Sequence, residues 1–351
     1  MAANYWESTQ RKHWQFTKDE LATMRQNLED EDPGLVHMFP LPELRYLNIY
    51  FNQQINRLGK RLGVRQQAMA TAQIYVKRFY TKIEIRRTNP YLLIATAVYL
   101  ACKMEETPQH IRLVGQEARS LWPGEMHHTN AGETTTKMGE CEFWLISEMN
   151  SQLIVHQPYR TLTARTPDFS LVPEEVSLAW SIINDHYMTD LPLLYPPHII
   201  ALTAILLAVV MLPTPKSAAG GASAANPQVP GLAAAQAALA QIRAGVVPTG
   251  TGGNSGSSTP TLTPQSSGGL TMLGENGGGV VGVVDNNGNK VIDPKLAKVQ
   301  RIGRWLAESN IDIEAMIDCT QELISFYECH EKYNDKHTRE QLNRFIKARG
   351  L

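Results

Sequence analysis

Apolar residues recur at spacings of three and four along most of the chain, which is the pattern of an amphipathic helix. In the first half of the chain this pattern predicts helices over Glu43–Leu62, Gln66–Ile83, Pro90–Thr107, Gln109–Leu121 and Thr134–Leu153. The third of them opens with Asn89-Pro90, a favourable cap and first-turn pair. Because that helix is apolar on nearly every side, we expect it at the centre of a bundle.

The helical pattern starts again at Pro173 and is then interrupted. Helices are predicted over Pro173–Tyr187, Pro197–Leu212, Asp293–Ser309 and Asp312–Tyr333. Between them, residues 213–292 turn to Gly, Ser, Ala, Pro and Thr, with few large apolar groups to offset the cost of ordering the backbone. The sequence therefore predicts an all-α protein with a mostly disordered insert.

The second block repeats the first in its letters as well as in its pattern. Residues 90–101 (PYLLIATAVYLA) align without gaps on residues 197–208 (PHIIALTAILLA) and share Pro, Thr, Ala, Leu and Ala in register. Two buried helices of this composition can also match by chance, but each segment occupies the same position within its block. We therefore interpret the two blocks as an internal duplication.

In a duplicated fold, residues that are needed only for packing should have equivalents in both copies. A residue without an equivalent is therefore a candidate for binding a partner. Beyond the aligned segments, Lys103 stands where the second block has Val210. A solvated lysine near a helix end would be an ordinary alternative, because a cation suits the carbonyl end of the helix dipole. Glu105 and Glu106 follow in the same turn, where the dipole disfavours anions, so the polar cluster indicates a binding surface.

Composition restricts the kind of partner. The 351 residues are 43% hydrophobic and carry a net charge of -1, so no overall field attracts nucleic acid or an anionic membrane. The longest apolar run, Ile199–Leu212, is shorter than the roughly 20 residues that cross a bilayer. The four cysteines show no metal-ligand spacing, which favours reduced thiols in an intracellular protein.

The run Leu100-Ala-Cys-Lys-Met-Glu-Glu106, which closes a buried third helix out of five, resembles the cyclin-box motif of the cyclin family. The resemblance implies two tandem five-helix cyclin boxes preceded by an N-terminal helix. The expected segments are 1–40 for the N-terminal helix, 41–157 for the first box, 172–212 plus 293–335 for the second, 213–292 for the insert and 336–351 for a C-terminal tail or helix.

The resemblance also implies a site. In cyclins a lysine at this position and a glutamate on the fifth helix hydrogen-bond a protein kinase beside its mobile helix. These roles fall on Lys103 and Glu142, with Glu140 as the second choice. The expected kinase-binding surface further contains Met104, Glu106, Ile146, Tyr5 and Trp6. Trp14 could extend the same surface, and packing within the chain would explain these three aromatic residues equally well.

Further runs resemble cyclins of the C type in particular, among them residues 3–8 (ANYWES), 76–80 (VKRFY), 140–143 (ECEF), 154–160 (IVHQPYR) and 189–197 (TDLPLLYPP). This resemblance implies a non-catalytic activator of a cyclin-dependent kinase in the Mediator kinase module. The expected partners are that kinase and the other subunits of the module, with no direct nucleic acid and no membrane. The expected location is the nucleus, and the expected role is regulation of RNA polymerase II transcription.

Other signals are weak or secondary. The glycine-rich run 277–282 matches a dinucleotide-binding pattern only in its letters, because no strand precedes it. His127-His128 lack cysteine or carboxylate partners, so we expect no metal and no cofactor. Within the insert, Thr214, Thr259 and Thr263 each precede a proline, and the bound kinase could phosphorylate them.

Two other functions are compatible with a fold of this kind. A DNA-binding general transcription factor can be built from two cyclin folds, but it would need a basic face and usually carries a zinc ribbon. The near-neutral charge and the cysteine pattern argue against it. A purely structural helical scaffold is the second rival, because a fold alone does not define a function. Capture of a kinase would separate the three.

Overall fold

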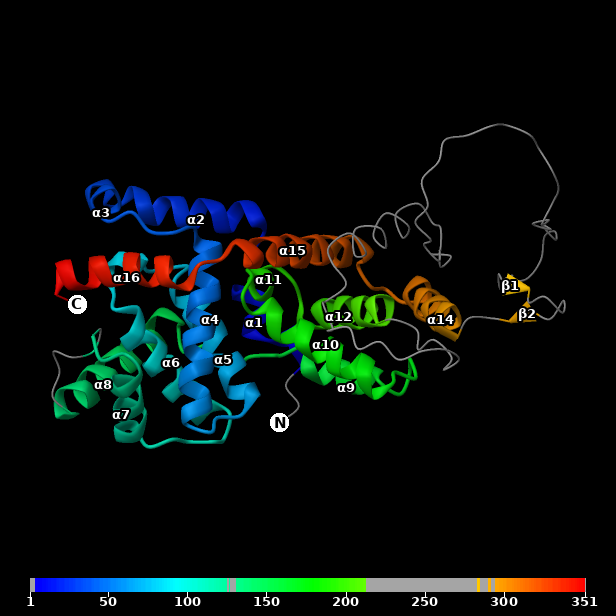
Figure 1. Cartoon of the computed structure of the whole chain (residues 1–351), viewed down its shortest axis with the longest axis horizontal. Helices are drawn as coiled ribbons and strands as arrows, with labels where there is room; N and C mark the ends of the chain where they lie inside the picture. Colours follow the sequence, from blue (N-terminus) through cyan, green and yellow to red (C-terminus); the bar gives the residue numbers. More distant parts are fainter. Residues whose placement is uncertain are drawn as a thin grey trace, which may run out of the picture.

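The structure is a computed structural model that describes residues 4–124, 126, 131–212, 283–284, 290–291 and 294–350, and these residues are almost entirely helical (Figure 1). The predicted all-α fold is thus confirmed. The N-terminal part contains η1 (Tyr5–Glu7), α1 (Thr9–His13), α2 (Lys18–Asp30) and α3 (Pro33–Met38). It leads into the first of two helical bundles that lie next to each other along the long axis of the molecule.

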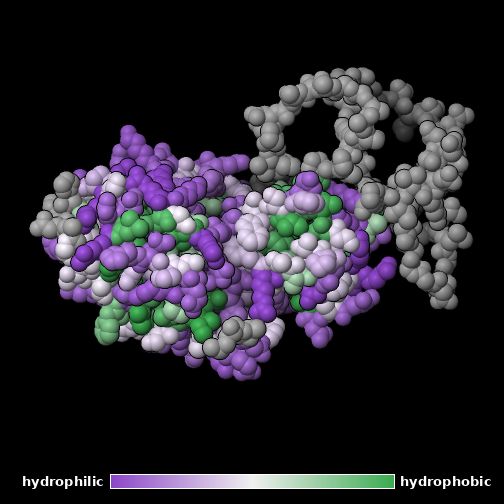
Figure 2. Space-filling view, turned by 90° about the horizontal axis from the view of Figure 1, so that it is seen from below, coloured by the Kyte–Doolittle hydropathy of each residue, from purple (hydrophilic) through white to green (hydrophobic). Residues whose placement is uncertain are grey.

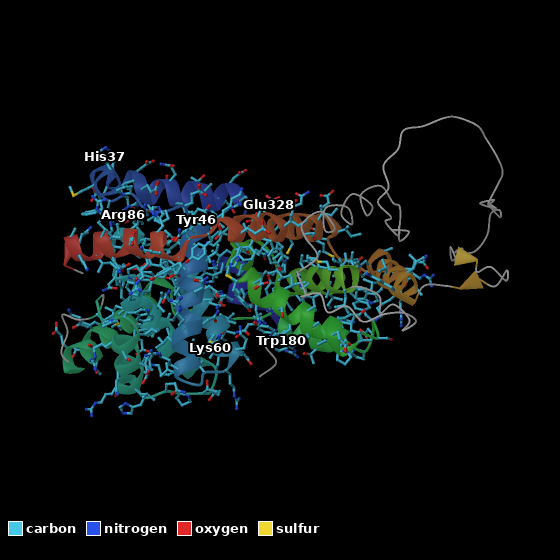
Figure 3. The ribbon with its side chains drawn as sticks, viewed as in Figure 1. His37, Tyr46, Lys60, Arg86, Trp180 and Glu328 are labelled. Atoms are coloured by element: carbon cyan, nitrogen blue, oxygen red, sulfur yellow. The ribbon has the colours of Figure 1, made fainter. Side chains whose placement is uncertain are left out.

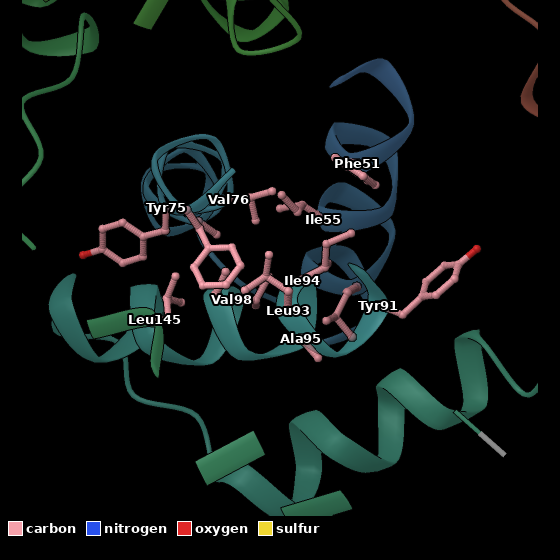
Figure 4. Packing of buried hydrophobic residues seen from close by; sticks show 14 of the residues in the cluster. Phe51, Ile55, Tyr75, Val76, Tyr91, Leu93, Ile94, Ala95, Val98 and Leu145 are labelled. Carbon is pink, nitrogen blue, oxygen red and sulfur yellow. The ribbon is translucent and has the colours of Figure 1, made fainter. Parts of the chain in front are cut away.

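The first bundle is formed by α4 (Leu44–Arg61), α5 (Gln66–Phe79), α6 (Pro90–Met104), α7 (Ile111–Leu121) and α8 (Ala131–Glu148), with η2 (Ile85–Arg87) before α6. As predicted, the Asn89 side chain caps α6, accepting hydrogen bonds from the backbone N–H groups of Tyr91 and Leu92. Helix α6 is buried on most sides and contacts each of the other four helices. Figure 4 shows its Leu93, Ile94 and Val98 facing side chains of the neighbouring helices.

The second bundle repeats this arrangement. It consists of α9 (Tyr159–Arg165), α10 (Pro173–His186), α12 (Pro197–Met211), α14 (Pro294–Glu308) and α15 (Ile313–Lys332), with the short α11 (Leu191–Leu194) before α12. Helix α12 contacts α9, α10, α14 and α15, as α6 contacts α4, α5, α7 and α8. Sequence analysis missed α9, which has only 7 residues yet buries Leu162 in the second core.

Equivalent polar contacts fix the register between the two bundles. In the first bundle the thiol of Cys141 on α8 contacts the hydroxyl of Thr96 on α6. In the second bundle Cys319 on α15 likewise lies beside Thr203 on α12. Burial raises the pKa of Cys141 to about 11 and that of Cys319 to about 12, so both thiols stay protonated near neutral pH. Glu142 and Thr320, which follow these two cysteines, therefore occupy equivalent positions.

The two ends of the chain pack against these bundles. For Trp14 the structure favours packing within the chain, one of the two alternatives left open: it is buried at 3% exposure, and its indole donates a hydrogen bond to the Gln152 side chain at 2.7 Å. The C-terminal helix α16 (Asp335–Arg349) returns from the second bundle to the first. Its Leu342, Phe345 and Ile346 belong to the first core.

Part of the predicted disordered insert has regular structure. The strands β1 (Val283–Val284) and β2 (Lys290–Val291) pair antiparallel within the segment that was predicted to be mostly disordered. Valine has a high β-propensity, and the hairpin contains three valines. The other residues of 213–292 lie outside the described ones. In the described part of the chain, no helix has the length and apolar character needed to span a bilayer.

Asp185, near the end of α10, gives the second bundle a pH dependence that can be tested. Burial raises the pKa of its carboxyl to about 6, although the hydroxyl of Tyr327 on α15 donates to it at 3.1 Å. The stability that the protonated carboxyl contributes is complete below its unfolded pKa of about 3.9 and is lost as pH rises through about 6. Asp185→Asn should therefore stabilise the protein at pH 7.5 by on the order of 2–3 kcal/mol.

Urea unfolding of Asp185→Asn and of the unsubstituted chain between pH 4 and 8 measures this effect. The two stabilities should converge toward pH 4, and the exposed Asp19→Asn serves as the control. A variant that is less stable than the parent at pH 7.5 would contradict the expectation, because the ionised carboxylate would then be needed in the folded state.

Candidate functional site

The polar cluster predicted from the sequence lies where α6 ends. The N–H of Thr107 donates to the carbonyl of Cys102 at 2.9 Å, and Glu106 adopts a left-handed φ of 56°. This is the helix-ending geometry that usually takes glycine. A glutamate there costs free energy, and such residues persist only where the surroundings hold them. The turn directs the chain away from the bundle directly after Lys103 and Met104, both of which are exposed.

Lys103 and Glu142 form an ion pair between the ammonium Nζ and the carboxylate Oε1, joining the last turn of α6 to α8. The Lys103 side chain is 38% exposed and that of Glu142 is 16% exposed. The ammonium also lies 4.5 Å from the ring centre of Tyr99, one turn earlier on α6. Because an ammonium has three N–H donors, one contact with Glu142 leaves it able to donate to a partner.

The structure assigns Glu105 a different role from the one predicted. Its carboxylate accepts hydrogen bonds from the Gln67 amide at 2.7 Å and from the Thr71 hydroxyl at 2.6 Å, both on α5. Burial raises the pKa of this carboxyl despite these bonds. Glu105 therefore fastens the end of α6 to α5, and it is Glu106 that stays exposed. The prediction of an outward acidic pair was wrong for Glu105.

Apolar side chains accompany the pair. On α8, Ile146 follows Glu142 by one turn and is partly buried against the first core, while Met104 is exposed beside Lys103. Phe143 is 78% exposed, and sequence analysis did not single it out. The spacing of apolar residues could have indicated its exposure, because residue 143 falls on the helix face opposite the buried Met138, Cys141 and Leu145. Seen from below, the half of the molecule that holds the first bundle shows hydrophobic patches among hydrophilic residues (Figure 2).

Tyr5 and Trp6 lie at the junction of the two bundles. Their rings contact those of His156, between the bundles, and His198 on α12, with centres 5.3–6.2 Å apart. They line a hollow of ≈ 760 Å³ that also includes Gln67, the residue that hydrogen-bonds Glu105. Tyr5 is partly buried and Trp6 is exposed, so packing within the chain covers more of the Tyr5 side chain than of the Trp6 side chain.

Among the described residues of the second bundle, none repeats this ion pair. The register set by the cysteines places Thr320 opposite Glu142, and the helix alignment places Val210 opposite Lys103. The ammonium of Lys295 instead donates to the carbonyls of Val210 and Leu212 at 2.7 and 2.8 Å, closing the end of α12 from within the chain. Trp180 of this bundle packs on Tyr159, with 4.5 Å between the ring centres. Figure 3 shows Trp180 in the second bundle and Arg86 in the first, well apart along the molecule.

Other candidate sites receive little support. Among the described residues, no three His, Cys, Asp or Glu side chains gather as metal ligands. His127-His128 and the three threonines Thr214, Thr259 and Thr263 lie outside the described part of the chain. Glu140, the second choice for the kinase contact, is exposed on α8, and the glutamate that pairs with Lys103 is Glu142.

The chain is similar to several known proteins. The family profile described as "Cyclin, N-terminal domain" matches residues 38–127. A Neurospora crassa protein described as an RNA polymerase II holoenzyme cyclin-like subunit is 62% identical over 359 residues, covering 100% of this chain and 99% of the relative. A Chaetomium globosum protein of the same description is 61% identical over 368 residues, covering 100% of both. A chain in the solved CAK complex of Chaetomium thermophilum has a TM-score of 0.48 and 23% identity, covering 58% of this chain and 67% of that chain.

Proposed function

The chain belongs to the cyclin family, among the RNA polymerase II holoenzyme cyclin-like subunits, and from this premise we propose that it binds and activates a cyclin-dependent protein kinase. The observation that carries the proposal is the Lys103–Glu142 ion pair, in which an exposed lysine at the end of a central helix meets a partly buried glutamate; the other bundle has Val210 and Thr320 at these positions. A charged pair that the duplicated fold does not need for packing is available for a partner.

The proposed mechanism follows from how protein kinases are switched on. A kinase is active when a lysine on one of its strands pairs with a glutamate on its mobile helix, so a partner that holds this helix inward raises activity. Lys103 and Glu142 would offer charge-assisted hydrogen bonds to the edge of that helix. Met104 and Ile146 would supply apolar contact, with Glu106 at the rim. This chain contributes no catalytic group in the proposed mechanism.

The required free energy exceeds what one ion pair can supply. Moving a kinase from mostly inactive to mostly active takes about 5.5 kcal/mol of preference for the active form. An interface of standard size buries roughly 1,600 Å² in total and can provide it. Phe143, the most exposed large hydrophobic side chain in the described part of the chain, lies on α8 beside Glu142 and would add apolar area. Tyr5 and Trp6 are the proposed extension.

The finer assignment is to the C type of cyclin. Its support is the set of C-type runs in the sequence, including residues 140–143 (ECEF), which contain Glu142. On this basis we propose the Mediator kinase module as the assembly, its cyclin-dependent kinase and other subunits as partners, and the nucleus as the location. Regulation of RNA polymerase II transcription is the proposed outcome.

Reconstitution tests the proposal. The purified chain is mixed with the cyclin-dependent kinase of the Mediator kinase module, and complex formation and phosphorylation of an RNA polymerase II tail peptide are measured. The proposal expects a stoichiometric complex and at least tenfold activation. Binding without activation would favour a scaffold, and no binding would refute the function.

The insert supplies a further expectation. In the reconstituted complex with ATP, Thr214, Thr259 and Thr263 should be phosphorylated, because each precedes a proline and bound kinase would be held close to them. Mass spectrometry of the complex locates the phosphates, and a complex with a kinase inactivated at its metal-binding aspartate is the control. Unmodified threonines in an active complex would contradict this expectation.

A further inference from the structure

A Thr-Pro pair outside the insert lies in an accessible turn of the second bundle. Thr166-Pro167 directly follows α9, and Pro167 and Asp168 are exposed. The Thr166 hydroxyl donates to the carbonyl of Leu162 at 2.9 Å, a bond within its own helical turn that is lost when the helix end frays. The other Thr-Pro pair in the described residues is Thr107-Pro108, whose hydroxyl is enclosed by protein.

The turn after Thr166 is held in an unfavourable conformation. Ser170 has a φ of 50°, which costs free energy for a residue with a Cβ. The conformation is held by the N–H of Leu171, which donates to the Thr166 carbonyl at 3.1 Å. Opening this turn releases the backbone strain at Ser170. The free energy needed to open the chain around Thr166 is therefore lower than it would be for an unstrained turn.

Two arginines surround the same turn. Arg165 pairs with Asp168 at 2.5 Å, and its guanidinium lies 5.2 Å from the ring centre of Trp305 on α14. Arg301, also on α14, donates to the Ser170 hydroxyl at 3.0 Å. Both reach the turn that begins at Thr166. Guanidinium groups bind phosphate oxygens through pairs of parallel hydrogen bonds, so this arrangement suits a phosphorylated side chain.

We propose that Thr166 is phosphorylated by a proline-directed Ser/Thr protein kinase and that Arg165 and Arg301 then bind the phosphate. In the reaction the Thr166 oxygen bonds to the γ-phosphorus of ATP, the bond from that phosphorus to the β–γ bridging oxygen breaks, and ADP leaves while the hydroxyl proton passes to the kinase's base. The new group carries a charge of about -1.5 to -2 and three acceptor oxygens. It would join the end of α9 to α14. This site does not depend on the proposed binding of a kinase at Lys103.

Phosphorylation of the folded full-length chain tests the site. A recombinant proline-directed kinase of the mitogen-activated type is supplied with ATP, and phosphates are located by mass spectrometry. Thr166 should be modified, Thr107 should not, and Pro167→Ala should lower modification of Thr166 at least tenfold. A synthetic peptide of residues 161–171 shows whether the sequence itself is a substrate. Phosphate on the Thr-Pro threonines of the insert with none on Thr166 would overturn the proposal.

Thermal unfolding tests the role of the arginines. An anion at the C-terminal end of a helix is unfavourable by itself, so the sign of the effect depends on the cations around it. Phosphorylation should raise the Tm of the unsubstituted chain by roughly 2–4 °C and should lower that of Arg301→Gln. Arg304→Gln, exposed on the same helix, is the matched control and should behave like the parent. An equal shift in the parent and in Arg301→Gln would refute binding of the phosphate by Arg301.

Discussion

Replacing Lys103 and Glu142 together by alanine is expected to abolish activation of the partner kinase while the chain still folds. Lys103 is exposed and Glu142 partly buried, and an ion pair with an exposed partner contributes only about 0–1 kcal/mol to stability. Because both charges are removed together, no uncompensated charge is left and the bundle stays intact. In a complex the same groups are desolvated and hydrogen-bonded to the kinase, and losing such anchors costs about 2 kcal/mol or more each. Kinase activity in the reconstituted complex should fall at least 100-fold, with the Tm of the free chain nearly unchanged.

The same helix supplies a matched control. Lys137 and Glu133 also form an exposed ion pair on α8, at 3.1 Å, so replacing both by alanine removes equal charges without touching the proposed site. That double variant should activate the kinase normally. Glu140→Ala, which alters the second-choice glutamate, should also have little effect. Full activation by the Lys103→Ala/Glu142→Ala variant would remove the basis for the site.

Duplication of the fold explains why the proposed site stands out in the sequence. Thr96 and Thr203 share a role in packing, which shows that similar letters in the two central helices reflect similar structure. Lys103 breaks that similarity at a position where the bundle itself accepts Val210. A difference between two copies of one fold therefore identifies a residue that packing does not require.

The helices were predictable because their apolar faces are long and regular, and the predicted ends lie within a few residues of the observed ones. Contacts between distant segments were not. Glu105 was predicted to point outward because it clusters with Glu106 where the helix dipole disfavours anions, and nothing in its local sequence indicates that Gln67 and Thr71 reach it from another helix. For Trp14 the sequence left packing and partner binding equally open, and the structure buries it against residues far along the chain.

The C-terminal helix is the clearest case of a contact that the sequence did not indicate. Segment 336–351 was predicted only as a tail or helix, yet α16 packs on α4, and Asn343 accepts a hydrogen bond from the hydroxyl of Tyr91 at 2.9 Å. Tyr91 lies in the first turn of α6, the helix that carries Lys103 in its last turn. The end of the chain thus supports the helix that presents the proposed site.

Phe345→Ala is accordingly expected to lower the free energy of unfolding by about 3–5 kcal/mol, the usual cost of removing a buried aromatic ring. Phe345 is almost completely buried in the first core, so the lost contacts leave a cavity. Truncation after Asn334 should cost more, because Leu342 and Ile346 leave with it. Urea unfolding measures both, with the exposed Lys347→Ala as the control on the same helix. If the truncated chain were as stable as the full one, α16 could not be part of the first core, and its contact with Tyr91 would have no bearing on α6.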